Sequence, residues 1–180
     1  FIAELRAKLE EQGVAENTLI VLQADNGPFI HYGPRGMVET LYKGGKGDFT
    51  EGGVRVPAMA VWPGVIEPNQ IVGDILHISD LFTTFARLGG ATDYIPRDRV
   101  IDGIDQTALL MKGDTHGRRD HVFIYAGPNL GATVKGNYKR HWISPDPVGE
   151  ASGIPAAFYF LPADPREKTP MLTNLIHLKS

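Results

Sequence analysis

The sequence predicts an α/β fold in its first part, followed by a small antiparallel sheet. Apolar residues recur at helical spacing in residues 1–12 and 80–88, and short apolar runs rich in β-branched residues lie between these segments. From residue 121 onward, short alternating segments separated by turn residues replace the helical pattern. We therefore expect an α/β domain in residues 1–103 and a small α+β subdomain in residues 104–180.

The first segments predict a helix that leads into a strand. Ile2, Leu5 and Leu9 lie at helical spacing with charged residues between them, and Gly13 is placed to end the helix. The apolar run at residues 18–22 then predicts a buried strand. We expect the helix to pack on the sheet to which this strand belongs, as a crossover helix does. Binding of the helix to a partner protein is the alternative.

A second helix is predicted at residues 80–88. Ser79 is a favourable N-cap, Asp80 suits the first helical turn, and the glycine pair after Leu88 ends the helix. His77 lies just before this cap, and we interpret it as a residue that makes local hydrogen bonds. A catalytic role for His77 is the alternative.

The remaining elements are predicted to be short. Residues 106–111 favour a short helix, and residues 144–155 favour a loop because they are rich in Pro, Gly and Ser. Gly136-Asn137 indicates a tight hairpin between two strands. The predicted strands of this region are residues 121–126, 132–135, 138–143 and 157–161.

The composition excludes several classes of protein. Of the 180 residues, 42% are hydrophobic and 22% charged, and the net charge of −3 gives no reason to expect nucleic acid as a partner. No apolar run is long enough to span a membrane. Cysteine is absent, which excludes disulfides and thiolate metal sites. Periplasmic, secreted and cytoplasmic locations all stay open.

The residue types with the clearest chemistry lie between residues 18 and 64. Asp25 and Asn26 directly follow the predicted strand, at the position where open α/β sheets bind ligands, and two hard oxygen donors suit Ca²⁺ or Mg²⁺. Lys46 lies in a glycine-rich loop, where an ammonium group can hold an anion. The structural alternative is an Asx-type turn at Asp25 and a solvated lysine at position 46.

Four short motifs follow one another in this region. They are Asp25-Asn26-Gly27-Pro28, Gly45-Lys46-Gly47, Glu51-Gly52-Gly53-Val54-Arg55-Val56-Pro57 and Trp62-Pro63-Gly64. In this order and spacing they resemble the type I sulfatases, the arylsulfatase family of the alkaline phosphatase superfamily. Lys135-Gly136-Asn137-Tyr138-Lys139 and the turn at residues 162–167 resemble later segments of that family. The resemblance implies part of an alkaline-phosphatase-like sheet with flanking helices, before a small antiparallel sheet.

The resemblance also implies roles for individual residues. In this family a formylglycine, made from the first residue of a Cys/Ser-x-Pro-x-Arg motif, attacks sulfur, and Ca²⁺ binds a sulfate oxygen. Asp25 and Asn26 match two of the metal ligands, and Lys46 matches the lysine that contacts the sulfate ester. His31 could face the substrate, with a loop role as the alternative. We expect Glu51 to hold the loop of Lys46 in place, and Arg55 to form a structural salt bridge.

Part of the family's machinery has no counterpart in these 180 residues. The Cys/Ser-x-Pro-x-Arg motif is absent, since Ser144-Pro145 has no arginine at the required place, and no early Asp-Asp pair precedes residue 18. Two ligands are too few for Ca²⁺, which takes six to eight oxygens. The chain starts with Phe1 inside a helical pattern. We therefore expect a missing amino-terminal part that supplies the formylglycine.

The leading hypothesis is thus a sulfatase fragment that contributes metal-binding and sulfate-binding residues and is inactive alone. The expected substrate is a small-molecule or carbohydrate sulfate ester. One alternative is a non-catalytic sulfatase-like domain. Another is a phosphomonoester or phosphodiester hydrolase of the same superfamily.

Overall fold

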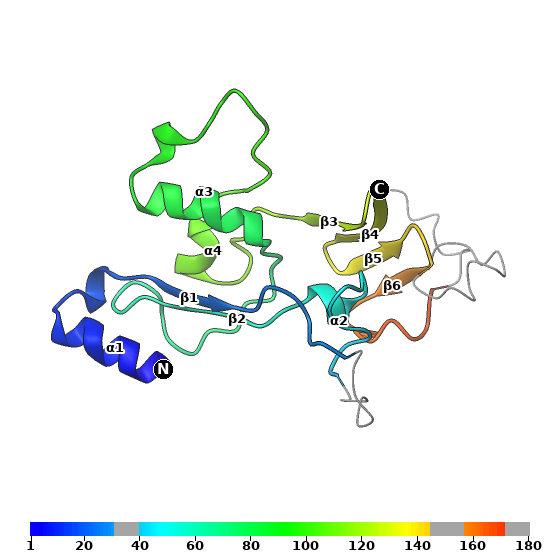
Figure 1. The fold of residues 1–180 in the computed structure, drawn as a ribbon, viewed down its shortest axis with the longest axis horizontal. Coiled ribbons are helices and arrows are strands. Elements are labelled where there is room, and N and C mark those ends of the chain that lie inside the picture. The colour runs from blue at the N-terminus through cyan, green and yellow to red at the C-terminus, as the bar shows by residue number, and fades with distance from the viewer. Residues whose placement is uncertain (31–39, 145–156, 172–180) are drawn as a thin grey trace. The chain divides into compact units, whose positions relative to one another are not determined.

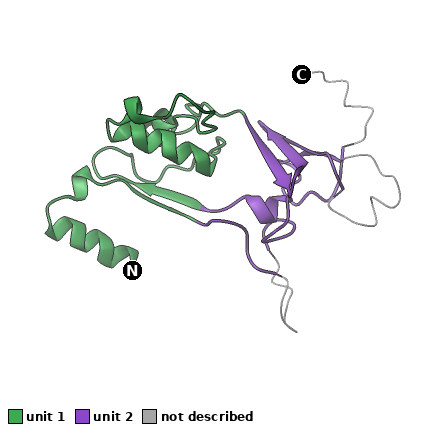
Figure 2. Ribbon diagram, turned by 45° about the horizontal axis from the view of Figure 1, so that its top comes forward, with its two compact units in different colours: residues 1–23, 58–120 green, residues 24–57, 121–180 purple. Residues whose placement is uncertain are grey.

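A computed structural model describes residues 1–30, 40–144 and 157–171 of the chain (Figure 1). The fold divides into two compact units, each assembled from two stretches of sequence (Figure 2). The first unit comprises residues 1–23 and 58–120, and the second comprises residues 24–57 and 121–180. The domain boundary predicted at residue 103 does not coincide with the limits of these units, and the predicted domains stay a prediction.

The first unit begins with the predicted helix, α1, at Ile2–Glu11. Gly13 adopts a φ of 68° and donates its N–H to the carbonyl of Glu10, which ends the helix as predicted. None of the α1 residues is buried. Leu9 and Ile20 line one small hollow together. The expectation of a helix well packed on a sheet is therefore not met by the described residues.

Strands β1 (Ile20–Gln23) and β2 (Ala58–Val61) follow and pair in antiparallel orientation, with a short 3₁₀ turn, η1 (Ala15–Asn17), before β1. The sequence predicted β1 as a buried strand, and this was wrong for the described residues. Leu22 is 43% exposed, because these two strands form a ribbon to which no other described strand adds. Trp62, just after β2, donates its indole N–H to the carbonyl of Glu16, at 2.8 Å.

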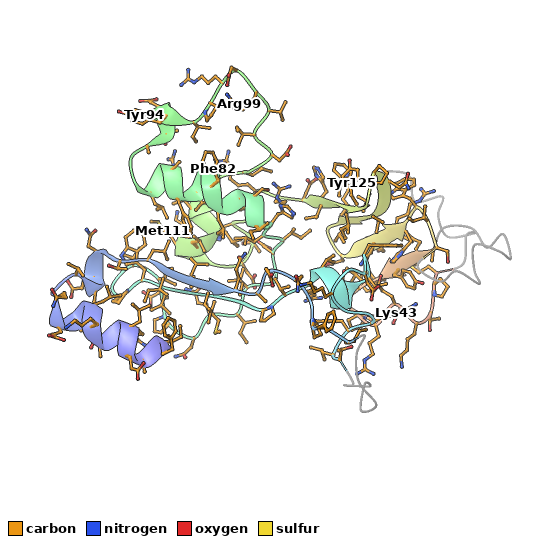
Figure 3. The ribbon with its side chains drawn as sticks, in the orientation of Figure 1. Lys43, Phe82, Tyr94, Arg99, Met111 and Tyr125 are labelled. Carbon is orange, nitrogen blue, oxygen red and sulfur yellow. The ribbon has the colours of Figure 1, made fainter. Side chains whose placement is uncertain are left out.

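The second predicted helix is α3, at Ile78–Leu88. Its N-cap is His77 rather than the predicted Ser79: the His77 ring accepts a hydrogen bond from the Ser79 N–H, and the carboxylate of Asp80 accepts one from the His77 N–H. The interpretation of His77 as a local hydrogen-bonding residue is thus confirmed. Phe82 on this helix is 52% exposed (Figure 3).

The first unit continues with η2 (Thr92–Tyr94) and α4 (Thr107–Lys112), and α4 confirms the short helix predicted at residues 106–111. A buried carboxylate joins this segment to α3. Asp80 is fully buried and forms an ion pair with Arg119, and it also accepts the N–H of Ile104. No helix in the described part of the chain is both long and apolar enough to cross a lipid bilayer.

The second unit contains a four-stranded antiparallel sheet in the order β3-β4-β5-β6. All four predicted strands and the hairpin are present, although β4 begins at Asn129, three residues earlier than predicted, and Gly136 turns between β4 and β5 with a φ of 53°. The β5 strand ends at His141, two residues earlier than predicted. Most of the predicted loop at residues 144–155 lies outside the described residues. The strands are β3 (His121–Ala126), β4 (Asn129–Lys135), β5 (Tyr138–His141) and β6 (Phe158–Phe160).

Candidate active site

The Asp25–Asn26 turn is the first part of the candidate site. Asn26 donates its side-chain N–H to the carbonyl of Gly27, at 2.9 Å, so its side-chain oxygen keeps its capacity to accept. Asp25 is exposed, and among the described residues no hydrogen bond or ion pair engages its carboxylate. The turn therefore offers a carboxylate and an amide oxygen, which is a donor set that fits a hard cation.

The second part of the site is the lysine loop, residues 43–53. Lys43, labelled in Figure 3, lies at its neck, where its carbonyl accepts the hydroxyl of Thr50 at 2.8 Å and the N–H of Gly52 at 2.7 Å. Within the loop, the carboxylate of Asp48 accepts the N–H of Gly45 at 2.8 Å. These bonds close the loop on itself. Lys46 lies near its tip, exposed, and none of the described carboxylates forms an ion pair with it.

The Asp25–Asn26 turn and the lysine loop are joined through their backbones. Gly27 donates its N–H to the carbonyl of Gly53 at 2.9 Å, and Lys46 donates its N–H to the carbonyl of Pro28 at 2.8 Å. A Cβ atom at Gly27 would overlap with the carbonyl oxygen of Gly52, so the approach requires glycine. The structure thus brings the segments of Asp25, Asn26 and Lys46 together within one unit.

The lysine loop ends in a short helix, α2 (Glu51–Val54), which the sequence did not predict. The side chain of Glu51 is 4% exposed and accepts a hydrogen bond from Lys139 Nζ at 3.0 Å. This contact supports the expectation that Glu51 holds the loop in place. Arg55 follows the helix and forms an ion pair with Glu51, at 3.7 Å, as expected of a structural salt bridge.

Glu51 belongs to a buried charged cluster with Lys139, His141 and Glu167. Lys139 Nζ lies 3.2 Å from Glu167 Oε1, and His141 Nε2 lies 2.5 Å from the same oxygen. The other oxygen of Glu167 accepts the N–H of Glu51 at 2.6 Å. Burial alone would raise the pKa of Glu167, but the hydrogen bond from His141, the charge of Lys139 and the N–H of Glu51 outweigh burial and lower that pKa.

His141 was not among the predicted site residues, although the pattern of β5 contained a signal for it. Residues two apart along a strand share one face, so Lys139 and His141 must lie on the same side of the sheet. In the structure both are fully buried, while Arg140 between them and Tyr138 before them are exposed. A lysine and a histidine on one buried face require acidic partners, and Glu51 and Glu167 are these partners.

The described residues leave two predictions about the site untested. His31 lies outside the described residues. In the described part of the chain, no group of three or more His, Cys, Asp or Glu side chains is placed to hold a metal ion. Asp25 and Asn26 therefore fit a cation only as part of a larger ligand set.

Comparison with known proteins decides the family. A family model described as Sulfatase matches residues 1–91, just over half of the chain. The chain belongs to the sulfatase family. The matched region includes the Asp25–Asn26 turn and the lysine loop, so the recognition that rested on these motifs is confirmed.

Individual relatives extend the similarity beyond the family match. Steryl-sulfatase of Rattus norvegicus is 37% identical over 166 residues, which is 89% of this chain and 26% of the relative. Arylsulfatase of Hemicentrotus pulcherrimus is 37% identical over 160 residues, 85% of this chain and 28% of the relative. This sulfatase chain thus spans about a quarter of the length of the curated relatives.

Solved structures confirm the predicted fold class. The crystal structure of a sulfatase from Pseudoalteromonas sp. superposes with a TM-score of 0.80 at 32% identity, over 94% of this sulfatase chain and 36% of that one. The α/β part and the small antiparallel sheet are therefore those of a sulfatase.

Proposed function

We propose that this chain contributes metal-binding and sulfate-binding residues to the site of a sulfate ester hydrolase. Asp25 and Asn26 serve as metal ligands, and Lys46 binds the sulfate group and acts in catalysis. The observation that carries the proposal is the pair of backbone hydrogen bonds, Gly27 to Gly53 and Lys46 to Pro28, that joins the oxygen donors to the lysine loop.

Lys46 has the properties that binding of a sulfate ester requires. Its ammonium group is exposed and has no ion-pair partner among the described residues, while its backbone is held by the bond to Pro28. Because the backbone is fixed, only the side chain has to become ordered when the ammonium group meets the charge that develops on sulfate oxygens. We propose that His31 provides a second contact to the substrate.

The metal that best fits the turn is Ca²⁺. A bound Ca²⁺ ion would neutralise negative charge on the sulfuryl oxygens. Asp25 supplies a charged oxygen and Asn26 a neutral one, and both suit Ca²⁺; Mg²⁺ is the alternative. We propose that the remaining ligands and the formylglycine lie in sequence outside these 180 residues, and the coverage of about a quarter of the relatives supports this.

The substrate is proposed to be a small-molecule or carbohydrate sulfate ester. Relatives are named steryl-sulfatase, arylsulfatase and N-acetylgalactosamine-6-sulfatase, so the names alone cover sterol, aryl and sugar esters. The shared feature of these names is the sulfate group, which is the part that Lys46 and the metal would contact.

Hydrolysis of a chromogenic aryl sulfate tests the proposal. The protein is expressed from its full open reading frame, assayed with Ca²⁺, and compared with Lys46→Ala and Asp25→Ala. We expect each variant to lower kcat/KM by about 100-fold or more, as loss of one group that stabilises transition-state charge does. Lys8→Ala is the matched control, because Lys8 is an exposed lysine whose ammonium group pairs only with Glu11 among the described residues. Unchanged turnover in both site variants would refute the assignment.

The same assay separates the alternatives. Faster turnover of an aryl phosphate than of an aryl sulfate would indicate a phosphoesterase. No turnover of either ester, together with an open reading frame that lacks a Cys/Ser-x-Pro-x-Arg motif, would indicate a non-catalytic domain.

A further inference from the structure

The buried charged cluster is not itself a catalytic group. Lys139 and His141 are fully buried, and Glu167 is 2% exposed. An ester in water cannot contact side chains with so little exposure. Burying charges is costly, and replacing a buried ion pair by apolar residues is often neutral or even stabilising. Stability alone is therefore a weak explanation for the cluster, and its contacts suggest another one.

The cluster holds both the backbone and the side chain of Glu51. Glu167 accepts the Glu51 N–H at 2.6 Å, while Lys139 bonds the Glu51 carboxylate at 3.0 Å. Glu51 is the first residue of α2 and lies inside the lysine loop, next to Gly52, whose N–H closes the neck of the loop on Lys43. A change in the position of Glu51 is therefore transmitted to the neck of the loop.

A second contact holds the loop two residues earlier. The ring of Phe49 lies 5.3 Å from the ring of His141, measured between centroids. Gly131 on β4 leaves room for this ring, since a Cβ atom there would lie 3.1 Å from Phe49. Phe49 is three residues from Lys46, so the sheet fixes the loop close to the lysine through one charged and one aromatic contact.

We propose that Glu167 is a positioning residue for Lys46: together with Lys139, His141 and Glu51 it holds the lysine loop in the conformation that presents Lys46 to the sulfate group. This inference rests on the proposed function, in which Lys46 contacts the sulfate. Glu167 follows the last strand of the sheet and lies 116 residues after Glu51. A residue far away in the sequence thereby holds the lysine loop.

A double-mutant cycle in the full-length protein tests the inference. Glu167→Gln keeps the shape of the side chain but removes its charge, and we expect kcat/KM for an aryl sulfate to fall by about 100-fold, the effect of a misplaced catalytic group. In a Lys46→Ala background the same substitution should change kcat/KM by no more than about twofold. The reason is that Glu167 is proposed to act only through the contact between Lys46 and the sulfate group.

Asp80→Asn is the matched control for the cycle. Asp80 is also a fully buried and paired carboxylate, but its described partners are Arg119, Ile104 and His77, none of which belongs to the lysine loop. Its effect on kcat/KM should be the same with Lys46 present or replaced. If Glu167→Gln also has the same effect in both backgrounds, Glu167 does not act through Lys46 and the inference is wrong.

Hydrogen exchange provides a readout that does not depend on activity. Glu167→Gln should speed amide exchange in residues 43–53, above all at Lys46 and Glu51, whose N–H groups are bonded to Pro28 and Glu167. Asp80→Asn should leave exchange in the loop unchanged. Faster exchange in Glu167→Gln, together with no hydrolysis of a sulfate ester by the unchanged protein, would refute the proposed function and not the positioning of the loop. Unchanged exchange would refute the positioning.

Phe49→Leu covers the case in which Glu167→Gln does not fold. This substitution removes the ring contact to His141 and leaves every bond of the charged cluster in place. It should speed amide exchange in the lysine loop and lower kcat/KM when Lys46 is present. In the Lys46→Ala background it should change kcat/KM very little. An additive effect of Phe49→Leu would contradict the inference.

Discussion

Asp80 and Arg119 form a two-bond ion pair in the interior of the first unit, with Arg119 Nε 2.8 Å from Asp80 Oδ2 and Arg119 Nη2 2.6 Å from Asp80 Oδ1. The same carboxylate accepts the N–H of Ile104 at 2.8 Å and that of His77 at 2.9 Å. One buried charge thus fixes the start of α3 and the segment that leads to α4. None of the described partners of Asp80 belongs to the lysine loop, so we expect the pair to act mainly on stability.

Arg119→Met should destabilise the protein strongly, because it leaves the buried Asp80 carboxylate without its counter-charge. Removal of one partner of a buried ion pair costs about 3–5 kcal/mol. Urea unfolding of the full-length protein measures the effect. Arg99→Met is the control: Arg99 pairs with Asp98 at 2.9 Å on the exposed surface, and its loss should not change the unfolding midpoint. Equal effects of the two substitutions would contradict the importance of burial.

Acid should destabilise the first unit through Asp80. Burial alone would raise the pKa of Asp80, but the hydrogen bonds from Arg119, Ile104 and His77 and the charge of Arg119 outweigh burial and lower it. Between this lowered pKa and the ordinary value of about 3.9, the unfolded state binds more protons than the folded state. The stability from the ionised carboxylate is thus complete above the ordinary value and is lost as the pH falls through the lowered pKa.

Asp80→Asn tests this pH dependence, since asparagine does not titrate. The free energy of unfolding, measured from pH 7 down to pH 3, should fall less steeply at the acid end for Asp80→Asn than for the unchanged protein. The variant will be less stable at pH 7, so the comparison concerns the slope. Identical slopes at the acid end would show that Asp80 has no lowered pKa.

Local patterns predicted the elements whose contacts are local. Buried and exposed residues alternate along β5, and Gly136 turns between β4 and β5, so the local sequence contains both this strand and the hairpin. The N-cap of α3 was predicted incorrectly because Ser79 and His77 are both able to accept a backbone N–H. Asp80 accepts the N–H of His77 and also pairs with Arg119, 39 residues later. The sequence near Ser79 does not indicate this distant partner.

Long-range contacts explain what the sequence did not predict. Helix α2 contains two glycines, which are poor helix formers, and it begins at Glu51, which is held by Glu167. No pattern near residue 51 indicates that partner. In the candidate site, the residue types at Asp25, Asn26 and Lys46 indicated their chemistry, whereas the backbone bonds that join their segments required the structure.

Gly27→Ala should separate the Asp25–Asn26 turn from the lysine loop. The added Cβ atom would overlap with the carbonyl oxygen of Gly52, so the backbone must move and the bond from Gly27 to Gly53 must lengthen. A shift of about 1 Å at such a junction can reduce kcat/KM for an aryl sulfate by about 100-fold. Gly73→Ala is the control, because its added Cβ atom would lie 3.9 Å from the nearest atom, Oδ1 of Asp114. Full activity of Gly27→Ala would show that the junction does not matter.

Removal of Ca²⁺ should abolish activity of the full-length protein, and the response of Asp25 variants should show whether this residue is a ligand. Asp25→Asn keeps an oxygen donor but loses the negative charge, whereas Asp25→Ala loses both. Since Ca²⁺ affinity depends on the number of charged ligands, the Ca²⁺ concentration for half-maximal activity after treatment with a chelator should rise in the order unchanged protein, Asp25→Asn, Asp25→Ala, by about tenfold or more for the last. Asp48→Asn is the control, because its carboxylate accepts the N–H of Gly45 within the lysine loop. An unchanged Ca²⁺ requirement in Asp25→Ala would exclude Asp25 as a ligand. Equal activity with Mg²⁺ would contradict the assignment of Ca²⁺ to this turn.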